Sequence, residues 1–226
     1  MKLIERPSPN HDARALPVSM IVLHYTGMPD ADAALDRLTS PDAGVSAHYL
    51  IREDGSVVRM VDEDRRAWHA GKSYWRGITD VNSASVGIEI VNPGHEFGYR
   101  RFPDDQIAAL IPLVTDIKAR HGIGRGNIVG HSDVAPARKE DPGELFPWED
   151  LARRRLALPS PTRDLMDPYW TDAGFLLALE RFGYDVTDAM KATIAFQRRF
   201  RPDQIDGIVD GECRAKLLAL LLPRPQ

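Results

Sequence analysis

Cysteines and long apolar runs are scarce in this chain. Its 226 residues include one cysteine, Cys213, so no intramolecular disulfide can form, and stability must come from packing, with or without a metal ion. Cys213 lies in a late segment of helical pattern, and buried cysteines are mostly inert packing groups, so the sequence does not favour a thiol nucleophile. No stretch is long and apolar enough to span a bilayer.

A secretory signal and a strong net charge are also missing. Glu5, Arg6 and two prolines interrupt the N-terminal segment where a signal peptide needs a continuous apolar core, which indicates a cytoplasmic protein. A periplasmic or cell-envelope location is the alternative if a leader has been removed. The net charge of −4 favours neither nucleic acid nor an anionic membrane as a partner. We therefore expect a globular monomer without nucleic-acid or membrane partners.

The apolar pattern predicts an α/β domain with a central sheet. Runs of strand length, a hairpin signal at Glu53-Asp54-Gly55 and one amphipathic helix ended by Gly122 alternate along the first part of the chain. The predicted strands are residues 18–24, 46–51, 57–60, 85–91 and 127–130, and the predicted helices are residues 30–39 and 103–121.

A Pro-rich segment, residues 158–162, predicts a linker. Three amphipathic segments follow it, at residues 171–182, 188–200 and 211–222, and they predict a compact three-helix module. We therefore expect two domains, residues 1–158 and 165–226.

Four side chains form a candidate catalytic set. Glu89 is a carboxylate in the middle of an apolar strand pattern, which is costly unless it is offset; a sheet-rim position or a buried ion pair is the structural alternative. His24 and His131 follow or end predicted strands, and each alone is compatible with a hydrogen-bonded structural role. Together with Asp141 they make a set of three nitrogen and oxygen donors, the number that a catalytic zinc site uses beside its open position.

Several separated motifs resemble one enzyme family. In order they are Leu23-His24-Tyr25-Thr26, Trp68-His69-Ala70-Gly71, Gly87-Ile88-Glu89-Ile90-Val91-Asn92, and Gly130-His131-Ser132-Asp133 continuing to Lys139-Glu140-Asp141-Pro142-Gly143. Residues 19–148 resemble the zinc-dependent N-acetylmuramoyl-L-alanine amidases of the AmpD and AmiD type, related to peptidoglycan recognition proteins. The resemblance implies a central mixed β-sheet flanked by helices.

The resemblance also implies roles and a substrate. His24, His131 and Asp141 would bind Zn²⁺, Glu89 would be the catalytic acid and base, and Lys139 would stabilise the transition state, unless it is a solvated surface lysine. The implied reaction is hydrolysis of the amide between N-acetylmuramic acid, in its 1,6-anhydro form, and L-alanine of a muropeptide during recycling. The alternatives are an exported amidase acting on intact peptidoglycan and a sensor that binds muropeptide without cleaving it.

Other parts of the chain are candidates for substrate binding. His69, His48, Trp68, Tyr74 and Trp75 are candidate substrate contacts. The alternatives are a structural role for His69, a position behind the cleft residues for His48, and a core position for the three aromatic residues. Asp133 is expected to fix its loop and not to bind metal. The segments 192–200 and 205–210 resemble the small helical peptidoglycan-binding domain found in cell-wall hydrolases, across residues 169–222. That module would bind peptidoglycan or only brace the catalytic domain.

Overall fold

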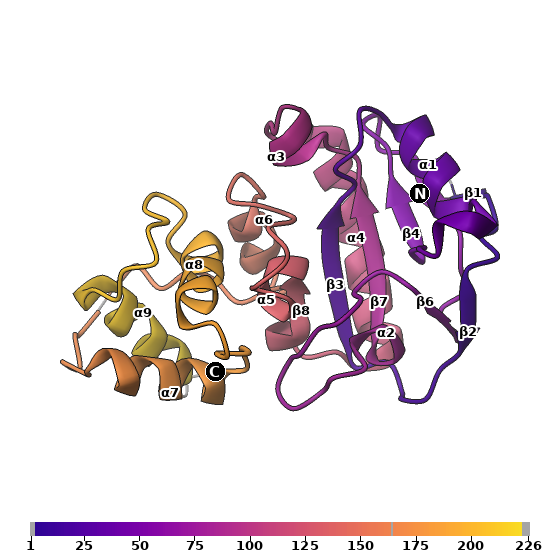
Figure 1. Cartoon of the computed structure of the whole chain (residues 1–226). Coiled ribbons are helices and arrows are strands. Elements are labelled where there is room, and N and C mark those ends of the chain that lie inside the picture. The colour runs from indigo at the N-terminus through magenta and orange to yellow at the C-terminus, as the bar shows by residue number, and fades with distance from the viewer. Residues whose placement is uncertain (1–2, 164, 223–226) are drawn as a thin grey trace.

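A six-stranded mixed sheet forms the centre of the computed structural model, which describes residues 3–163 and 165–222 (Figure 1). Its strands follow the order β1-β5-β4-β7-β3-β8. Their bounds are β1 Leu3–Glu5, β3 Met20–Tyr25, β4 Tyr49–Ile51, β5 Val57–Arg59, β7 Ser85–Ile90 and β8 Ile128–Gly130, and β2 (His11–Ala13) pairs with β6 (Arg65–Ala67) in a small second sheet. The α/β class with a mixed sheet is confirmed, as is the hairpin between β4 and β5.

Helices connect and flank the strands. They are α1 Ala31–Thr39, α2 Val81–Ala84, α3 Gly94–Phe97, α4 Asp104–His121, α5 His131–Val134, α6 Trp148–Arg153, α7 Asp172–Phe182, α8 Ala189–Phe200 and α9 Gly211–Leu221, with short 3-10 turns at Pro41–Ala43 and Arg125–Asn127. The side chains of Asp30, Thr171, Asp188 and Asp210 accept the N-terminal amides that four of these helices leave free. Among the described residues, no helix is both long enough and apolar enough to cross a membrane.

The two faces of the sheet bury different clusters. Alternate residues of a strand point to opposite faces, so Ile21 and Leu23 of β3 pack with α4, whose Leu110 and Ile117 are fully buried. The opposite face carries two separate clusters. One contains Leu50 and α1, and the other contains Met20, Val22, Val129 and residues of the C-terminal helices. Each large apolar side chain buried in this way contributes about 1.5–3 kcal/mol.

The C-terminal helices lie beyond the β8 edge of the sheet, whereas α1 lies towards the β1 edge; α8 is next to α5, and α7 and α9 lie farther from the sheet (Figure 1). The three predicted helices are thus present. Their apolar residues, among them Phe175, Leu179 and Phe196, belong to the same cluster as Met20 and Val22 of the central strand. The boundary near residues 158–165 stays a prediction, but residues on both sides of it share one core.

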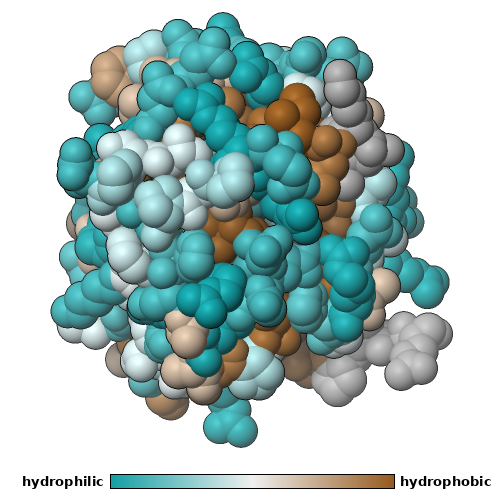
Figure 2. All heavy atoms as spheres, turned by 90° about the vertical axis from the view of Figure 1, so that its right-hand side faces the viewer, coloured by the Kyte–Doolittle hydropathy of each residue, from teal (hydrophilic) through white to brown (hydrophobic). Residues whose placement is uncertain are grey.

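The side of the molecule that carries α1 and the β1 edge has a mainly hydrophilic surface with scattered apolar residues (Figure 2). Two apolar residues of β1, Leu3 and Ile4, have 41% and 38% of their surface exposed. All three residues of β1 are exposed, and its shortness limits the backbone that this edge offers to another strand.

Candidate active site

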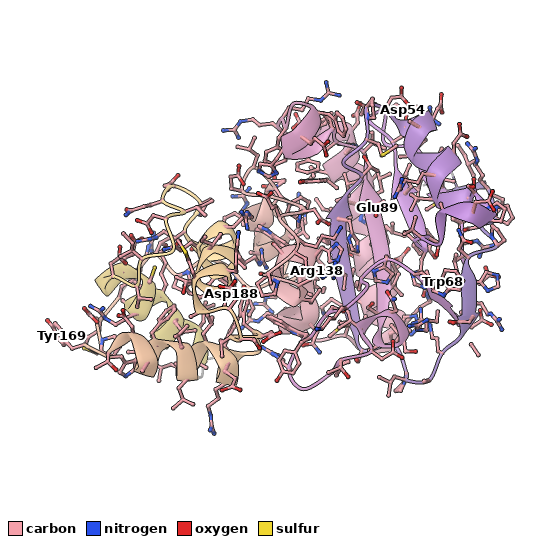
Figure 3. The ribbon with its side chains drawn as sticks, viewed as in Figure 1. Asp54, Trp68, Glu89, Arg138, Tyr169 and Asp188 are labelled. Carbon is pink, nitrogen blue, oxygen red and sulfur yellow. The ribbon has the colours of Figure 1, made fainter. Side chains whose placement is uncertain are left out.

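The candidate residues lie where three parallel strands end. His24 of β3 is the register partner of Glu89 of β7, and His131 directly follows β8. Because the carboxyl ends of parallel strands meet at one edge of the sheet, residues far apart in sequence converge there. Figure 3 shows Glu89 on these central strands, with Trp68 and Arg138 on either side of it.

Three potential metal ligands converge in this region. The Nδ1 atoms of His24 and His131 are 2.9 Å apart, and they lie 3.0 Å and 3.1 Å from Oδ2 of Asp141. All three residues are at least nine-tenths buried. A tetrahedral zinc site with bonds of about 2.0–2.1 Å separates its ligands by about 3.3 Å, so this triangle fits a single divalent ion. No fourth His, Cys, Asp or Glu joins the group within the described residues, which leaves a position for water or substrate.

Hydrogen bonds behind the two imidazoles hold their rings. Nε2 of His131 donates to the carbonyl oxygen of Ala70 at 3.1 Å, so its Nδ1 keeps a free lone pair. Nε2 of His24 lies 3.1 Å from Nδ1 of His69, whose Nε2 lies 3.2 Å from the Ser85 hydroxyl. Since that hydroxyl donates to the Val81 carbonyl, the protons of this chain all point away from the metal-binding atoms.

Electrostatics favour the neutral imidazoles that metal binding requires. Burial, together with the nearby His131 ring, lowers the pKa of His24 to about 4. Burial and the neighbouring His24 ring also hold the pKa of His69 well below its usual value. The pKa of Asp141 is lowered against its desolvation by contacts with His131 and His24, so this carboxyl stays ionised.

Glu89 lines a cleft with a carboxyl group that is partly buried. Its Oε2 is buried and has no hydrogen-bond partner among the described residues. Burial raises the pKa of Glu89 well above its usual value, the charge of Asp141 adds to this, and Lys139 opposes it. A carboxyl group with such a raised pKa in a cleft is suited to proton transfer.

The cleft above the triad carries charged, aromatic and apolar walls. Glu89 and Lys139 line it with the three potential ligands, and of the five predicted substrate contacts Trp68 and His69 reach it. Four further lining residues were not among the predicted site residues: Tyr25, Arg37, Phe97 and Arg138. Tyr25 and Arg138 adjoin His24 and Lys139 in the chain, which is a usable signal, whereas Arg37 and Phe97 have none.

The other three predicted substrate contacts do not line this cleft. His48 is 0% exposed. Its Nδ1 accepts the Gly87 amide and its Nε2 lies 3.1 Å from the Arg65 carbonyl, so both ring nitrogens face backbone groups inside the protein. Trp75 is 2% exposed and packs edge-on against Tyr184 in the apolar cluster. Tyr74 lines different pockets, next to the C-terminal helices.

Comparisons with known proteins agree with this geometry. The family model described as N-acetylmuramoyl-L-alanine amidase matches residues 14–144. N-acetylmuramoyl-L-alanine amidase AmiD of Escherichia coli is 40% identical over 90% of this chain and 82% of its own length. The 1,6-anhydro-N-acetylmuramyl-L-alanine amidase AmpD of Enterobacter cloacae is 35% identical over 63% of this chain and 84% of its own length.

Solved structures extend the similarity beyond the family model. E. coli AmiD in complex with the substrate anhydro-N-acetylmuramic acid-L-Ala-D-γ-Glu-L-Lys superimposes with a TM-score of 0.82 at 37% identity, covering 93% of this chain and 91% of AmiD. AMPDH3 from Pseudomonas aeruginosa gives a TM-score of 0.80 at 33% identity, covering 95% of this chain and 94% of its own. This chain belongs to the N-acetylmuramoyl-L-alanine amidase family and is an amidase.

Proposed function

We propose that this amidase is zinc-dependent and that His24, His131 and Asp141 hold the ion. The proposal is supported by three lone-pair-bearing atoms that lie about 3 Å from one another, with hydrogen bonds that direct the imidazole protons away from them. Two imidazoles and one carboxylate suit zinc better than magnesium or calcium, which take oxygen ligands.

The remaining residues divide the chemistry between them. Zn²⁺, when bound, supplies Lewis acidity that activates water and polarises a carbonyl group. Glu89 takes the proton from the attacking water as the new C–O bond forms, and the same carboxyl then donates that proton to the amine, which leaves as the amide C–N bond breaks. Lys139 places a positive charge beside the oxygen that becomes negative, a contribution of about 10²–10³ in rate where single donors have been removed.

We propose a 1,6-anhydro-muropeptide as the substrate, cleaved between the anhydro-muramic acid and L-alanine in peptidoglycan recycling. The AmpD relatives carry this substrate in their names, and E. coli AmiD has been crystallised with such a molecule. The cleft offers an indole face, that of Trp68, for a sugar ring, and cations such as Arg138 for the carboxylates of a peptide stem.

Mass spectrometry of the products tests the proposed function. A defined anhydro-muropeptide should yield anhydro-muramic acid and the free stem peptide, activity should disappear on chelation, and zinc should restore it. Glu89→Gln should retain the metal and lose about 10²–10⁴ in kcat, because the amide cannot accept the proton. Activity that survives complete metal removal, or Glu89→Gln that is as fast as the parent, would contradict the mechanism.

The compartment in which the enzyme works determines which substrate it meets. A recycling enzyme meets imported fragments in the cytoplasm, which is the location we propose, whereas an exported enzyme meets intact peptidoglycan. Fractionation of the native protein together with an assay on intact sacculi distinguishes the two. Sedimentation with the envelope and release of stem peptides from sacculi would favour the exported amidase, and muropeptide bound but left intact would favour a sensor.

A further inference from the structure

We propose that the C-terminal module positions the metal ligands through Tyr184, in the connection between α7 and α8, and Arg199 of α8, which hold Asp133 next to His131. The inference rests on the proposed metal site. It assigns the C-terminal module a role inside the catalytic centre, whether or not that module also binds peptidoglycan.

Asp133 connects the two parts of the chain. This residue is 1% exposed, and its Oδ2 accepts the amide of Gly130, the residue before His131, at 2.7 Å. Its Oδ1 accepts the hydroxyl of Tyr184 at 2.5 Å, which confirms that Asp133 fixes its loop. The helix that carries His131 and Asp133, α5, has four residues and cannot maintain its geometry through its own hydrogen bonds. Its position therefore depends on contacts from outside.

Arg199 supplies the charge that a buried carboxylate needs. Nε of Arg199 lies 3.8 Å from Oδ2 of Asp133, and the guanidinium carbon stands 3.1 Å from the ring centre of Trp148. Arg199 is 7% exposed, so the ion pair and the cation–π contact are largely shielded from water. Removing either partner would leave a buried charge uncompensated, which fixes the two side chains together.

The adjacent arginine contacts the other side of the same loop. Arg198 lies 3.3 Å from Glu140 and 3.7 Å from Glu144, on either side of Asp141 in the chain. The amide of Ser132 donates to the Asp141 carbonyl at 2.9 Å, so both ends of the loop are joined. Two consecutive residues of α8 therefore contact the neighbours of two metal ligands. Arg199 contacts Asp133, which follows His131, and Arg198 contacts residues on either side of Asp141.

The packing of α8 makes this contact rigid. Phe196 and Phe200 are 0% and 3% exposed and belong to the cluster that contains Met20 and Val22 of β3, the strand that carries His24 near its end. One apolar core therefore supports the strand that carries His24 and the helix α8, which contacts the segments of His131 and Asp141. A binding module on a free tether would not share buried residues with the strand of a metal ligand.

Metal affinity of the full chain tests the inference. Tyr184→Phe keeps the ring in the core and removes the hydroxyl, so the metal-free variant should bind Zn²⁺ about ten-fold more weakly in competition with a chromogenic chelator. Hydrogen exchange should rise in the peptide covering residues 128–142, a change that needs no bound metal to be seen.

Two variants serve as controls. Leu179→Ala opens a cavity in the same cluster, where Leu179 is 0% exposed, and should lower Tm while leaving zinc affinity unchanged well below Tm. Tyr169→Phe removes the hydroxyl of a tyrosine that is 85% exposed and should change neither quantity.

The outcomes separate the two proposals. If the parent protein bound no zinc, the proposed zinc-dependent function and this inference would both be wrong. A parent that binds zinc, with Tyr184→Phe binding as tightly and exchanging as slowly, would overturn the inference alone. Equal loss of affinity in Leu179→Ala and Tyr184→Phe would also overturn it, because general destabilisation would then account for both.

Discussion

Gly87→Ala offers a sharp test of how the site is held. A Cβ atom at this position of β7 would lie 2.4 Å from Cγ and 2.6 Å from Nδ1 of His69. Nonbonded carbon atoms prefer about 3.5–4.0 Å, so the imidazole must retreat by about 1 Å or more. That movement breaks the 3.1 Å contact between His69 and Nε2 of His24.

The expected magnitudes follow from two separate effects. Forcing a side chain into a packed region costs about 1–3 kcal/mol of unfolding free energy. Losing the hydrogen bond behind a metal-binding imidazole lowers metal affinity by about 10–100-fold. Urea unfolding of the metal-free protein measures the first effect, and competition with a chromogenic zinc chelator measures the second.

Gly124→Ala is the matched control. Gly124 has φ −69° and ψ 146°, which alanine adopts readily, and nothing lies within 4 Å of the place that its Cβ atom would take. Its stability should stay within about 0.5 kcal/mol of the parent or increase slightly.

Adding His69→Ala to Gly87→Ala tests the steric cause directly. The double variant should recover stability relative to Gly87→Ala, with a coupling of about 0.5–3 kcal/mol, because the clashing ring is gone. Its metal affinity should stay low, because His24 still lacks its partner. If Gly87→Ala were as stable as Gly124→Ala and bound zinc as tightly, Gly87 would not be needed to make room for the His69 ring.

Three further changes have defined outcomes. Lys139→Met should lower kcat by about 10²–10³ at unchanged Tm, whereas Lys191→Met, an exposed lysine on α8, should leave kcat unchanged; equal kinetics of the two variants would count against Lys139. Burial and Arg14 lower the pKa of His48 to about 3, so the unfolded chain binds this proton first as the pH falls below about 6.5. The contribution of neutral His48 to the free energy of unfolding is fully present above pH 6.5 and decreases as the pH falls towards 3. Between pH 7 and pH 5 the decrease is about 2 kcal/mol, at 1.36 kcal/mol per pH unit. Urea midpoints of the parent and of His48→Gln at both pH values measure this, and parallel pH dependence would refute it. Phe175→Ala should cost about 3–5 kcal/mol in thermal unfolding, because the ring is fully buried among the C-terminal helices, and a loss below 1 kcal/mol would mean that the cluster is loosely packed.

The longer strands and helices were predictable because their signals are local, whereas the short strands β1, β2 and β6 and the short helices α2, α3, α5 and α6 were not predicted. The apolar run ending at His24 and the stripe of α4 each follow the period of one element, and Asp30, where the first predicted helix begins, caps α1. The convergence of the metal ligands was inferred from motif resemblance. Its geometric cause, the register between His24 and Glu89, depends on strand pairing, which no local pattern specifies.

Side-chain direction in the loop after β6 could not be predicted. Trp68 reaches the cleft and Trp75 enters the core, although both lie in one segment without a period. The same holds for His48 and His69, because which imidazole faces the cleft depends on what covers the sheet. Tyr184 and Asp133 are 51 residues apart, and the helical pattern of α7 and α8 contains nothing that predicts their contact.

The division of one sheet face into two apolar clusters explains why a polar site can exist there. Leu50, Glu89 and His24 are register neighbours across β4, β7 and β3, so their side chains share a face. Leu50 packs under α1 on one side, and Val22 packs with the C-terminal helices on the other. A single continuous cluster would fill the space between them with apolar atoms and would leave Glu89 no access to water. The C-terminal helices thus pack behind one side of this gap, against Val22 of β3, without lining it themselves. The stability they contribute by burial offsets the cost of burying two imidazoles and two carboxylates close together.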